Sequence, residues 1–339
     1  MEVKTLYRRL VLVATCLTFV VVVVGAYVRL MDAGLGCPDW PGCYGALTPA
    51  YAEDSIARAV EAQGGDHGPV SLKKAWKEMF HRYLAGALGL LILAIAIAGW
   101  QWRRALDQSP VLATVLPLLV AVQAALGMWT VTLLLKPVIV TLHLLGGMAT
   151  LALLAWLSAR QWAYPTRVGA KRRARLLRLW AAAALVIVVA QIALGGWVSS
   201  NYAALACIDF PTCHGVWRPD MDFEHGFQLV RELGRTAAGT HLAYEALTAI
   251  HWTHRVGALI TLLVVSVTAA MLWRVRELRA HAAVLATLLG VQVSLGVANV
   301  LAGLPLGVAV AHNAMAAVLL VTLVVINFAL FRGTSGSPP

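Results

Sequence analysis

Residues 10–30 read LVLVATCLTFVVVVVGAYVRL, a run with no proline and no charged side chain before Arg29. A helix needs about 20 mostly apolar residues to cross the hydrocarbon core of a bilayer, and this run provides them. It is too long for the apolar part of a typical signal peptide, and no small-residue cleavage site follows it before Arg29. We therefore expect a retained membrane span, in which Cys16 is a small apolar filler.

Seven further segments share this length and apolar character: 80–100, 111–133, 138–158, 179–199, 248–272, 283–303 and 306–330. Of the 339 residues, 60% are hydrophobic and only 13% are charged, which suits a chain whose solvent is mostly lipid. The sequence therefore predicts an all-α integral membrane protein with eight transmembrane helices in the lipid bilayer.

The net charge of +11 could suggest a nucleic-acid partner, but the basic residues gather in short runs beside the apolar segments. This arrangement is typical of membrane orientation, and we expect no nucleic acid to bind. With eight spans all the basic runs fall on one side, so both termini are predicted to be cytoplasmic. The two long loops, 31–77 and 200–247, then lie outside.

Several short motifs occur twice in the same order. CPDWPGC (37–43) matches CIDFPTC (207–213), FHRYLAGAL (80–88) matches THRVGALI (253–260), and VQAALGMWTV (122–131) matches VQVSLGVANV (291–300). Successive landmarks are offset by 170, 173 and 169 residues, so the two halves are collinear. Because each half has four spans and starts inside, we expect two tandem four-helix bundles in a parallel repeat, related by a pseudo-two-fold axis. The expected units are 1–159, a basic linker 160–178, 179–331 and a tail 332–339.

Four histidines lie at equivalent places in these repeats: His81, His143, His254 and His312. Each half presents two of them, on alternate helices and at the same depth in the outer leaflet. A single intramembrane histidine can be a satisfied contact between helices, but four at matched positions indicate a site. Paired histidines from facing helices of a bundle are one way to hold haem iron from both sides. Zinc fits less well, because no third and fourth ligand converge on either pair.

The halves differ next to the first histidine. Glu78 precedes His81 by three residues and shares its helix face, whereas His251 takes the corresponding place in the second half. The carboxylate suits a site that moves protons or stabilises positive charge, although it could instead cap the start of the helix. Arg82 and Arg255 directly follow the histidines, where they could bind haem propionates or extend to the membrane interface.

The ordered set of motifs resembles the haem A synthase family over nearly the whole chain. The motifs that carry the resemblance are EMFHR with Glu78 and His81, TLHLLGG with His143, IHWTHR with His254, and AHNAMAA with His312. GLGCPDWPGCYG is similar to the first outer loop of the cysteine-containing bacterial members. The resemblance implies a multi-pass protein of the bacterial inner membrane, with its sites toward the outer side.

The resemblance also implies an activity, the oxidation of the C8 methyl of haem O to the formyl group of haem A for terminal oxidases. The first half would hold the substrate through His81 and His143, with Glu78 as the catalytic group. The second half would hold a haem b cofactor through His254 and His312. Contacts with a haem O synthase or with oxidase assembly factors, and a homo-oligomer, are left open.

The cysteines of each outer loop are close in sequence and face an oxidising compartment, so two local disulfides are expected, Cys37–Cys43 and Cys207–Cys213. These loops could act as lids over the outer mouths of the bundles, and the first pair could be redox-active or structural. Two other classes remain open. One is a di-haem b electron-transfer protein that does not modify haem, and the other is a transporter built from parallel repeats.

Overall fold

The computed structural model describes residues 2–63, 65, 68, 70–162 and 171–332. Within these ranges eight helices are long and apolar enough to cross a membrane, which confirms the predicted spans. They are α1 (Glu2–Leu30), α3 (Leu72–Gln101), α5 (Val111–Thr132), α6 (Pro137–Arg160), α7 (Lys171–Ser200), α9 (Tyr244–Trp273), α10 (Arg279–Leu301) and α11 (Leu306–Arg332). The described part contains no β-strand, only isolated β-bridges.

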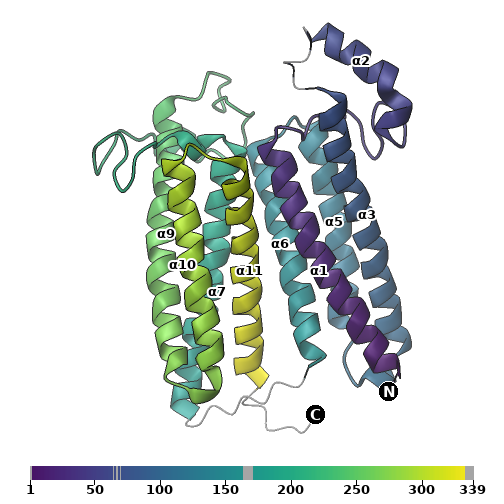
Figure 1. Cartoon of the computed structure of the whole chain (residues 1–339), viewed down its shortest axis with the longest axis vertical. Coiled ribbons are helices and arrows are strands. Elements are labelled where there is room, and N and C mark those ends of the chain that lie inside the picture. The colour runs from purple at the N-terminus through teal and green to yellow at the C-terminus, as the bar shows by residue number, and fades with distance from the viewer. Residues whose placement is uncertain (1, 64, 66–67, 69, 163–170, 333–339) are drawn as a thin grey trace.

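Short helices occur in the connections. They are η1 (Pro49–Ala52), α2 (Glu53–Ala62), α4 (Arg103–Leu106), η2 (Ala203–Leu205), α8 (Phe223–Gly226) and η3 (Arg276–Leu278). The long connection between α1 and α3 therefore contains a helix of its own, α2, which lies beyond the N-terminal end of α3 (Figure 1).

Local chemistry explains where the long helices begin. Ser71 is the N-cap of α3, and its hydroxyl accepts a hydrogen bond from the Lys74 N–H at 3.2 Å. Helix α6 begins at Pro137, a residue that suits the first helical turn because its missing N–H would have no partner there. These two starts fix how far His81 and His143 lie from the beginning of their helices.

Two details differ from expectation. Helix α7 already begins at Lys171, so the end of the predicted basic linker is helical, because Ala174 and Leu177 are buried in the apolar core. The middle of the linker, 163–170, and the tail from 333 lie outside the described residues. Cys16 is exposed on α1, off the buried stripe formed by Val11, Ala14 and Thr18, and so it is not a core filler.

The long helices form two groups (Figure 1). In the first group, α3 contacts α1 and α5, and α6 also contacts α1 and α5, so that α3 and α6 lie on a diagonal. In the second group α9 contacts α7 and α10, and α11 contacts the same two helices. Helix α6 packs against both α7 and α11, and α1 packs against α11, which joins the groups.

Polar contacts also join the groups at the C-terminal ends of α1 and α7. The Arg29 Nη2 atom donates to the Ser199 carbonyl oxygen at 2.7 Å, and the Tyr202 hydroxyl donates to the Asp32 carboxylate at 2.7 Å. The Arg29 guanidinium also lies 4.0 Å from the centroid of the Tyr202 ring. Both hydrogen bonds join residues that are 170 apart in sequence, which is the offset between the two cysteine loops.

Helix α1 begins, and α11 ends, at the end of the molecule opposite to α2 and the cysteine loops (Figure 1). The four sequence-selected histidines lie nearer the loop end of their helices, because α3, α6, α9 and α11 all begin there and each histidine is in the first half of its helix (Figure 1). This arrangement brings the candidate residues of each group into the neighbourhood of its own cysteine loop.

Candidate functional site

The four histidines form two pairs, one inside each group of helices. His81 on α3 and His143 on α6 come from diagonal helices and are near enough to interact electrostatically. His254 on α9 and His312 on α11 have the same relation in the second group. The structure therefore brings together the residues that the sequence paired.

Each imidazole packs against a glycine of a neighbouring helix. A Cβ atom built at the glycine would lie within 3.3 Å of the histidine Cε1 in all four cases: Gly25 and His81 (2.9 Å), Gly127 and His143 (3.3 Å), Gly195 and His254 (3.1 Å), Gly296 and His312 (3.1 Å). A larger residue would push the ring from its place. The four glycines thus form cradles that hold the rings where they are.

The polar atoms of these rings are poorly satisfied by the protein. The Nδ1 atoms of His81, His143 and His312 are buried and have no hydrogen-bond partner among the described residues. Buried polar atoms normally have partners, so such exceptions call for an explanation. Paired imidazoles that are held in glycine cradles fit a site for a large ligand that binds between them, as haem does between two histidines.

Glu78 is buried, with 4% of its surface exposed, and it binds the first cysteine loop. Its Oε2 atom accepts a hydrogen bond from the Cys37 N–H at 3.0 Å, and its Oε1 atom pairs with Arg82 Nη2 at 2.5 Å. The alternative that Glu78 caps α3 is wrong, because Ser71 is the cap and Glu78 lies in the second turn. Glu78 instead joins the loop to the helix that carries His81.

Arg82 strengthens the same connection. Its Nη1 atom donates to three carbonyl oxygens of the loop, those of Asp39 at 2.8 Å, Pro41 at 3.3 Å and Gly42 at 2.5 Å. The sequence left open whether this guanidinium binds propionates or extends to the interface. The structure shows a third role, in which it holds the backbone of the cysteine loop.

The second half repeats this connection with different chemistry. The His251 Nδ1 atom accepts a hydrogen bond from the Cys207 N–H at 3.2 Å, and Arg255 Nε lies 3.3 Å from His251 Nε2. Arg255 also donates to the carbonyl oxygens of Thr212 at 2.8 Å and Cys207 at 2.9 Å. In each half, then, one buried side chain and one arginine tie the cysteine loop to the helix, and we call this pair the loop anchor. The buried side chain is the carboxylate of Glu78 in the first half and the imidazole of His251 in the second.

Both expected disulfides are confirmed. The S–S distance is 2.04 Å for Cys37–Cys43 and 2.03 Å for Cys207–Cys213, and all four cysteines are fully buried. The first pair lies in a small apolar cluster that includes Ile56 of α2 and Met79 of α3. Each disulfide thus closes a loop that packs onto the N-terminal part of a histidine-bearing helix.

An aspartate organises each loop from within. The Asp39 carboxylate accepts hydrogen bonds from the N–H groups of Tyr44 and Gly45, and Asp209 accepts from those of His214 and Gly215. The Thr212 hydroxyl and the Gly215 N–H lower the pKa of Asp209 from 3.8 to about 2. The carboxylate of Asp209 is therefore charged at neutral pH and fixes the turn after the proline.

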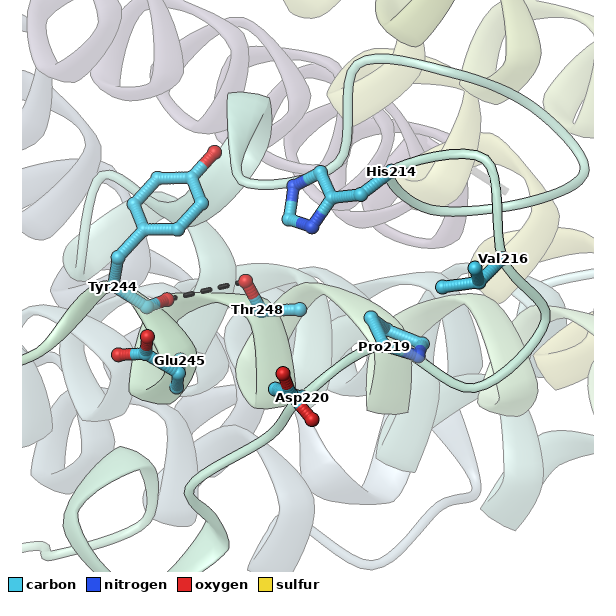
Figure 2. A pocket seen from close by; sticks show the side chains of 7 residues that line it. All are labelled: His214, Val216, Pro219, Asp220, Tyr244, Glu245 and Thr248. Atoms are coloured by element: carbon cyan, nitrogen blue, oxygen red, sulfur yellow. Dashed lines mark hydrogen bonds between the residues drawn. The ribbon is translucent and has the colours of Figure 1, made fainter.

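A pocket of about 200 Å³ lies between the second cysteine loop and the start of α9 (Figure 2). His214, Asp220, Tyr244 and Glu245 are among its lining residues. The His214 ring stacks on the Tyr244 ring at 5.7 Å, and His214 Nε2 lies 2.8 Å from the Ala206 carbonyl oxygen. None of the candidate residues of the histidine pairs lines this pocket, so it is a feature of the loop surface and separate from them.

Sequence reasoning missed several residues of the site. The cradle glycines were not singled out, although Gly25 and Gly195 differ by the 170-residue offset of the cysteine loops. Gln191 was also missed, and its amide nitrogen lies 3.0 Å from His254 Nδ1. Gln191 has no counterpart in the first half, where Val21 takes the equivalent place, so the repeat gave no signal for it.

Known proteins resemble this chain over nearly its full length. Residues 8–324 match the family described as cytochrome oxidase assembly protein. A protein of Shewanella oneidensis named heme A synthase is 42% identical over 321 residues, which cover 94% of this chain and 95% of that protein. A protein of the same name from Chelativorans sp. is 30% identical over 343 residues, covering 95% of this chain and 89% of its own length. The chain belongs to the cytochrome oxidase assembly protein family.

Proposed function

We propose that this chain is a haem A synthase, an oxidoreductase that converts the C8 methyl of haem O to a formyl group through successive hydroxylations. The observation that carries the proposal is the 42% identity to a heme A synthase over 94% of the chain. The paired histidines and their glycine cradles support it, because a haem-modifying protein must hold haem iron. The product, haem A, would serve terminal oxidase assembly.

The proposed architecture is two parallel four-helix bundles related by a pseudo-two-fold axis, 1–159 and 179–331. Its support is the matching set of helix contacts in the two groups, together with the matching loop anchors. The contact between α6 and α11, equivalent helices of the two halves, is what such an axis requires. We place both termini in the cytoplasm because the basic runs lie at that end of the spans.

The membrane is then the bacterial inner membrane, and the histidine pairs and disulfides lie toward its outer side. An oxidising compartment on that side agrees with two formed disulfides. Contact with a haem O synthase, which would deliver an apolar substrate, belongs to the same proposal, as do contacts with oxidase assembly factors and a homo-oligomer.

The first half is the proposed catalytic half. His81 and His143 would hold the iron of haem O, and their cradles restrain the position of each ring. Glu78 lies one helical turn before His81, so its carboxylate is on the same face of α3. Its role is to accept a proton or to stabilise positive charge as the methyl group is oxidised.

The second half is the proposed cofactor half, with His254 and His312 as the ligands of a haem b. That cofactor supplies one-electron redox chemistry when it is bound. His251 replaces the carboxylate there, while it keeps the hydrogen bond to the loop. Replacing His254 or His312 with Leu should remove the low-spin haem b spectrum from a protein that still inserts, and an unchanged spectrum in both variants would contradict the ligand assignment.

The decisive experiment separates the charge of Glu78 from its structural role. Glu78→Gln keeps an acceptor for the Cys37 N–H, and Glu78→His copies the anchor that the second half uses. Both remove the carboxylate. A general acid or base typically contributes about 10²–10⁴-fold in rate, so cells with either variant and a haem O synthase should accumulate haem O and make little haem A.

Chromatography of extracted haems measures this outcome, and Glu78→Ala serves as the matched variant that also loses the anchor. Normal haem A yield from the Gln and His variants, with loss only in Glu78→Ala, would reduce Glu78 to a loop anchor. Wild-type protein that holds haem b but never yields haem A would instead favour an electron-transfer protein.

A further inference from the structure

The second half contains a polar contact to a candidate haem ligand that the first half lacks. Gln191, on α7, places its Nε2 atom 3.0 Å from His254 Nδ1 and 3.0 Å from the His254 carbonyl oxygen. Nδ1 of His81, the equivalent ring in the first half, is buried and has no partner among the described residues. The two halves therefore differ in how firmly the equivalent ring is held.

The packing around Gln191 is specific to the same half. A Cβ atom at Gly257 on α9 would overlap the Gln191 amide oxygen, so the side chain needs a glycine at that place. The first half has Val21 and Leu84 at the matching positions, by the offsets of 170 and 173 residues. The second half thus has an amide that faces a glycine, and the first half has two branched apolar residues at the same two positions.

The other glutamines near the rings differ between the halves in another way, because Gln123 Nε2 has no hydrogen-bond partner among the described residues whereas Gln292 contacts a histidine ring. Gln123 and Gln292 occupy matching positions on α5 and α10. Gln292 Nε2 lies 3.3 Å from His312 Nε2, the opposite ring nitrogen to the one that Gln191 contacts on His254. Gln191 therefore stands out as a contact to Nδ1 that is made in one half only.

We propose that Gln191 is a positioning residue that makes the second haem site a permanent one, whereas the unanchored His81 lets haem exchange in the first. This inference rests on the proposed function, in which one half keeps its haem and the other releases a product after each reaction. A bond at Nδ1 leaves Nε2 to face the iron, and it fixes the angle of the ring.

The hydrogen-bond chemistry of an amide suits this role. A neutral imidazole that binds iron through Nε2 carries its proton on Nδ1, which then needs an acceptor. In the haem-free chain the Gln191 Nε2 atom donates to the His254 carbonyl oxygen and faces Nδ1. When His254 binds iron through Nε2, the amide must turn and give up the bond to the carbonyl oxygen, so that Oε1 accepts the Nδ1 proton. Such a bond raises the basicity of the ligand, and loss of a partner of this kind typically costs about 10–100-fold in metal affinity.

The test compares two variants of nearly equal size. Gln191→Met fills the space against Gly257 without an amide, and Gln191→Glu keeps an acceptor for Nδ1. We expect Gln191→Met to lose haem b to apomyoglobin about 10–100-fold faster than wild type and to show a raised midpoint potential. Gln191→Glu should retain haem b and show a lowered potential, because a carboxylate is the stronger acceptor.

Three outcomes are informative. The proposal is supported if Gln191→Met loses haem b faster than wild type and has a raised midpoint potential, while Gln191→Glu retains haem b and has a lowered midpoint potential. Equal haem retention and equal potentials in wild type and Gln191→Met would overturn it and leave Gln191 as packing. Wild-type protein that binds no haem b at all would overturn the proposed cofactor site itself, and with it this inference, so the two failures can be told apart.

Discussion

Gly195→Ala tests whether the glycine cradles hold the histidines in a ligand geometry. The new Cβ atom would lie 3.1 Å from His254 Cε1, so the ring must move by a few tenths of an ångström. Adding one methyl group to a packed interior costs about 1–3 kcal/mol when the neighbour cannot move freely. Gln191 restrains this ring on its Nδ1 side, so the displacement caused by the methyl group moves the ring nitrogen that would bind iron.

The penalty is larger in the haem-bound protein, because there the iron and Gln191 would both fix the ring, whereas in the apoprotein Gln191 alone restrains it and the ring can shift away from the methyl group. We therefore expect haem b affinity to fall about 5- to 150-fold, the equivalent of about 1–3 kcal/mol. The apoprotein should be no less stable than wild type, since alanine is favoured over glycine in a helix by about 1 kcal/mol.

Gly290→Ala is the matched control, because Gly290 is also in a helix and a Cβ there would meet nothing within 4 Å. The assay is haem titration of purified apoprotein followed by absorption spectroscopy, with thermal unfolding of the same samples. Equal haem affinity in Gly195→Ala, Gly290→Ala and wild type would refute the cradle. Equal weakening in the two variants would refute it as well, because the effect would then not depend on His254.

Three further outcomes follow from the loops and the junction between the helix groups. Arg82→Ala removes the donor to three carbonyl oxygens of the first cysteine loop, so protease cleavage within residues 37–46 should become several times faster. Arg255→Ala is the matched variant, and it should speed cleavage of the second cysteine loop only. The pKa of Asp209 is lowered from 3.8 to about 2, so its stabilisation of the second loop is present above about pH 4 and is lost as the pH falls toward 2. The amide chemical shift of Gly215 should follow this titration. In Asp209→Asn the shift should not change over the same pH range. Tyr202→Phe removes one outer hydrogen bond between the groups and should lower the free energy of unfolding by about 0.5–1.5 kcal/mol, measured by denaturation in micelles; a value at or above that of wild type would contradict the role of the junction.

The eight helices were predictable from sequence because each apolar run matches the thickness of a bilayer. The pairing of the histidines was predictable as well, since equal offsets place His81 and His254 on equivalent helices. The starts of helices were less accurate. Basic residues before an apolar run look like a loop, and only the burial of Ala174 and Leu177 shows that α7 extends through them.

The loop anchors could not be predicted, because helix spacing gives the face of a residue but not its partner across a fold. Glu78 and Arg82 are one helical turn apart, which indicates an ion pair, yet nothing local shows that both bind backbone groups near Cys37. The cradle glycines were hidden for a related reason. Glycine is common in membrane helices, and nothing in the sequence around Gly25 reveals its contact with His81.

The junction between α1 and α7 also bears on the ancestry of the chain. A two-fold axis brings each residue near it toward its own copy, so a dimer of identical first halves would set Arg29 against Arg29 and Asp32 against Asp32. In this chain the equivalent positions have diverged, and Arg29 meets Ser199 while Asp32 meets Tyr202. In the proposed parallel repeat, a duplication that joins two such halves in one polypeptide removes the requirement for identical partners. The two sides can then be fitted to each other, and each half can carry its own residues at equivalent positions.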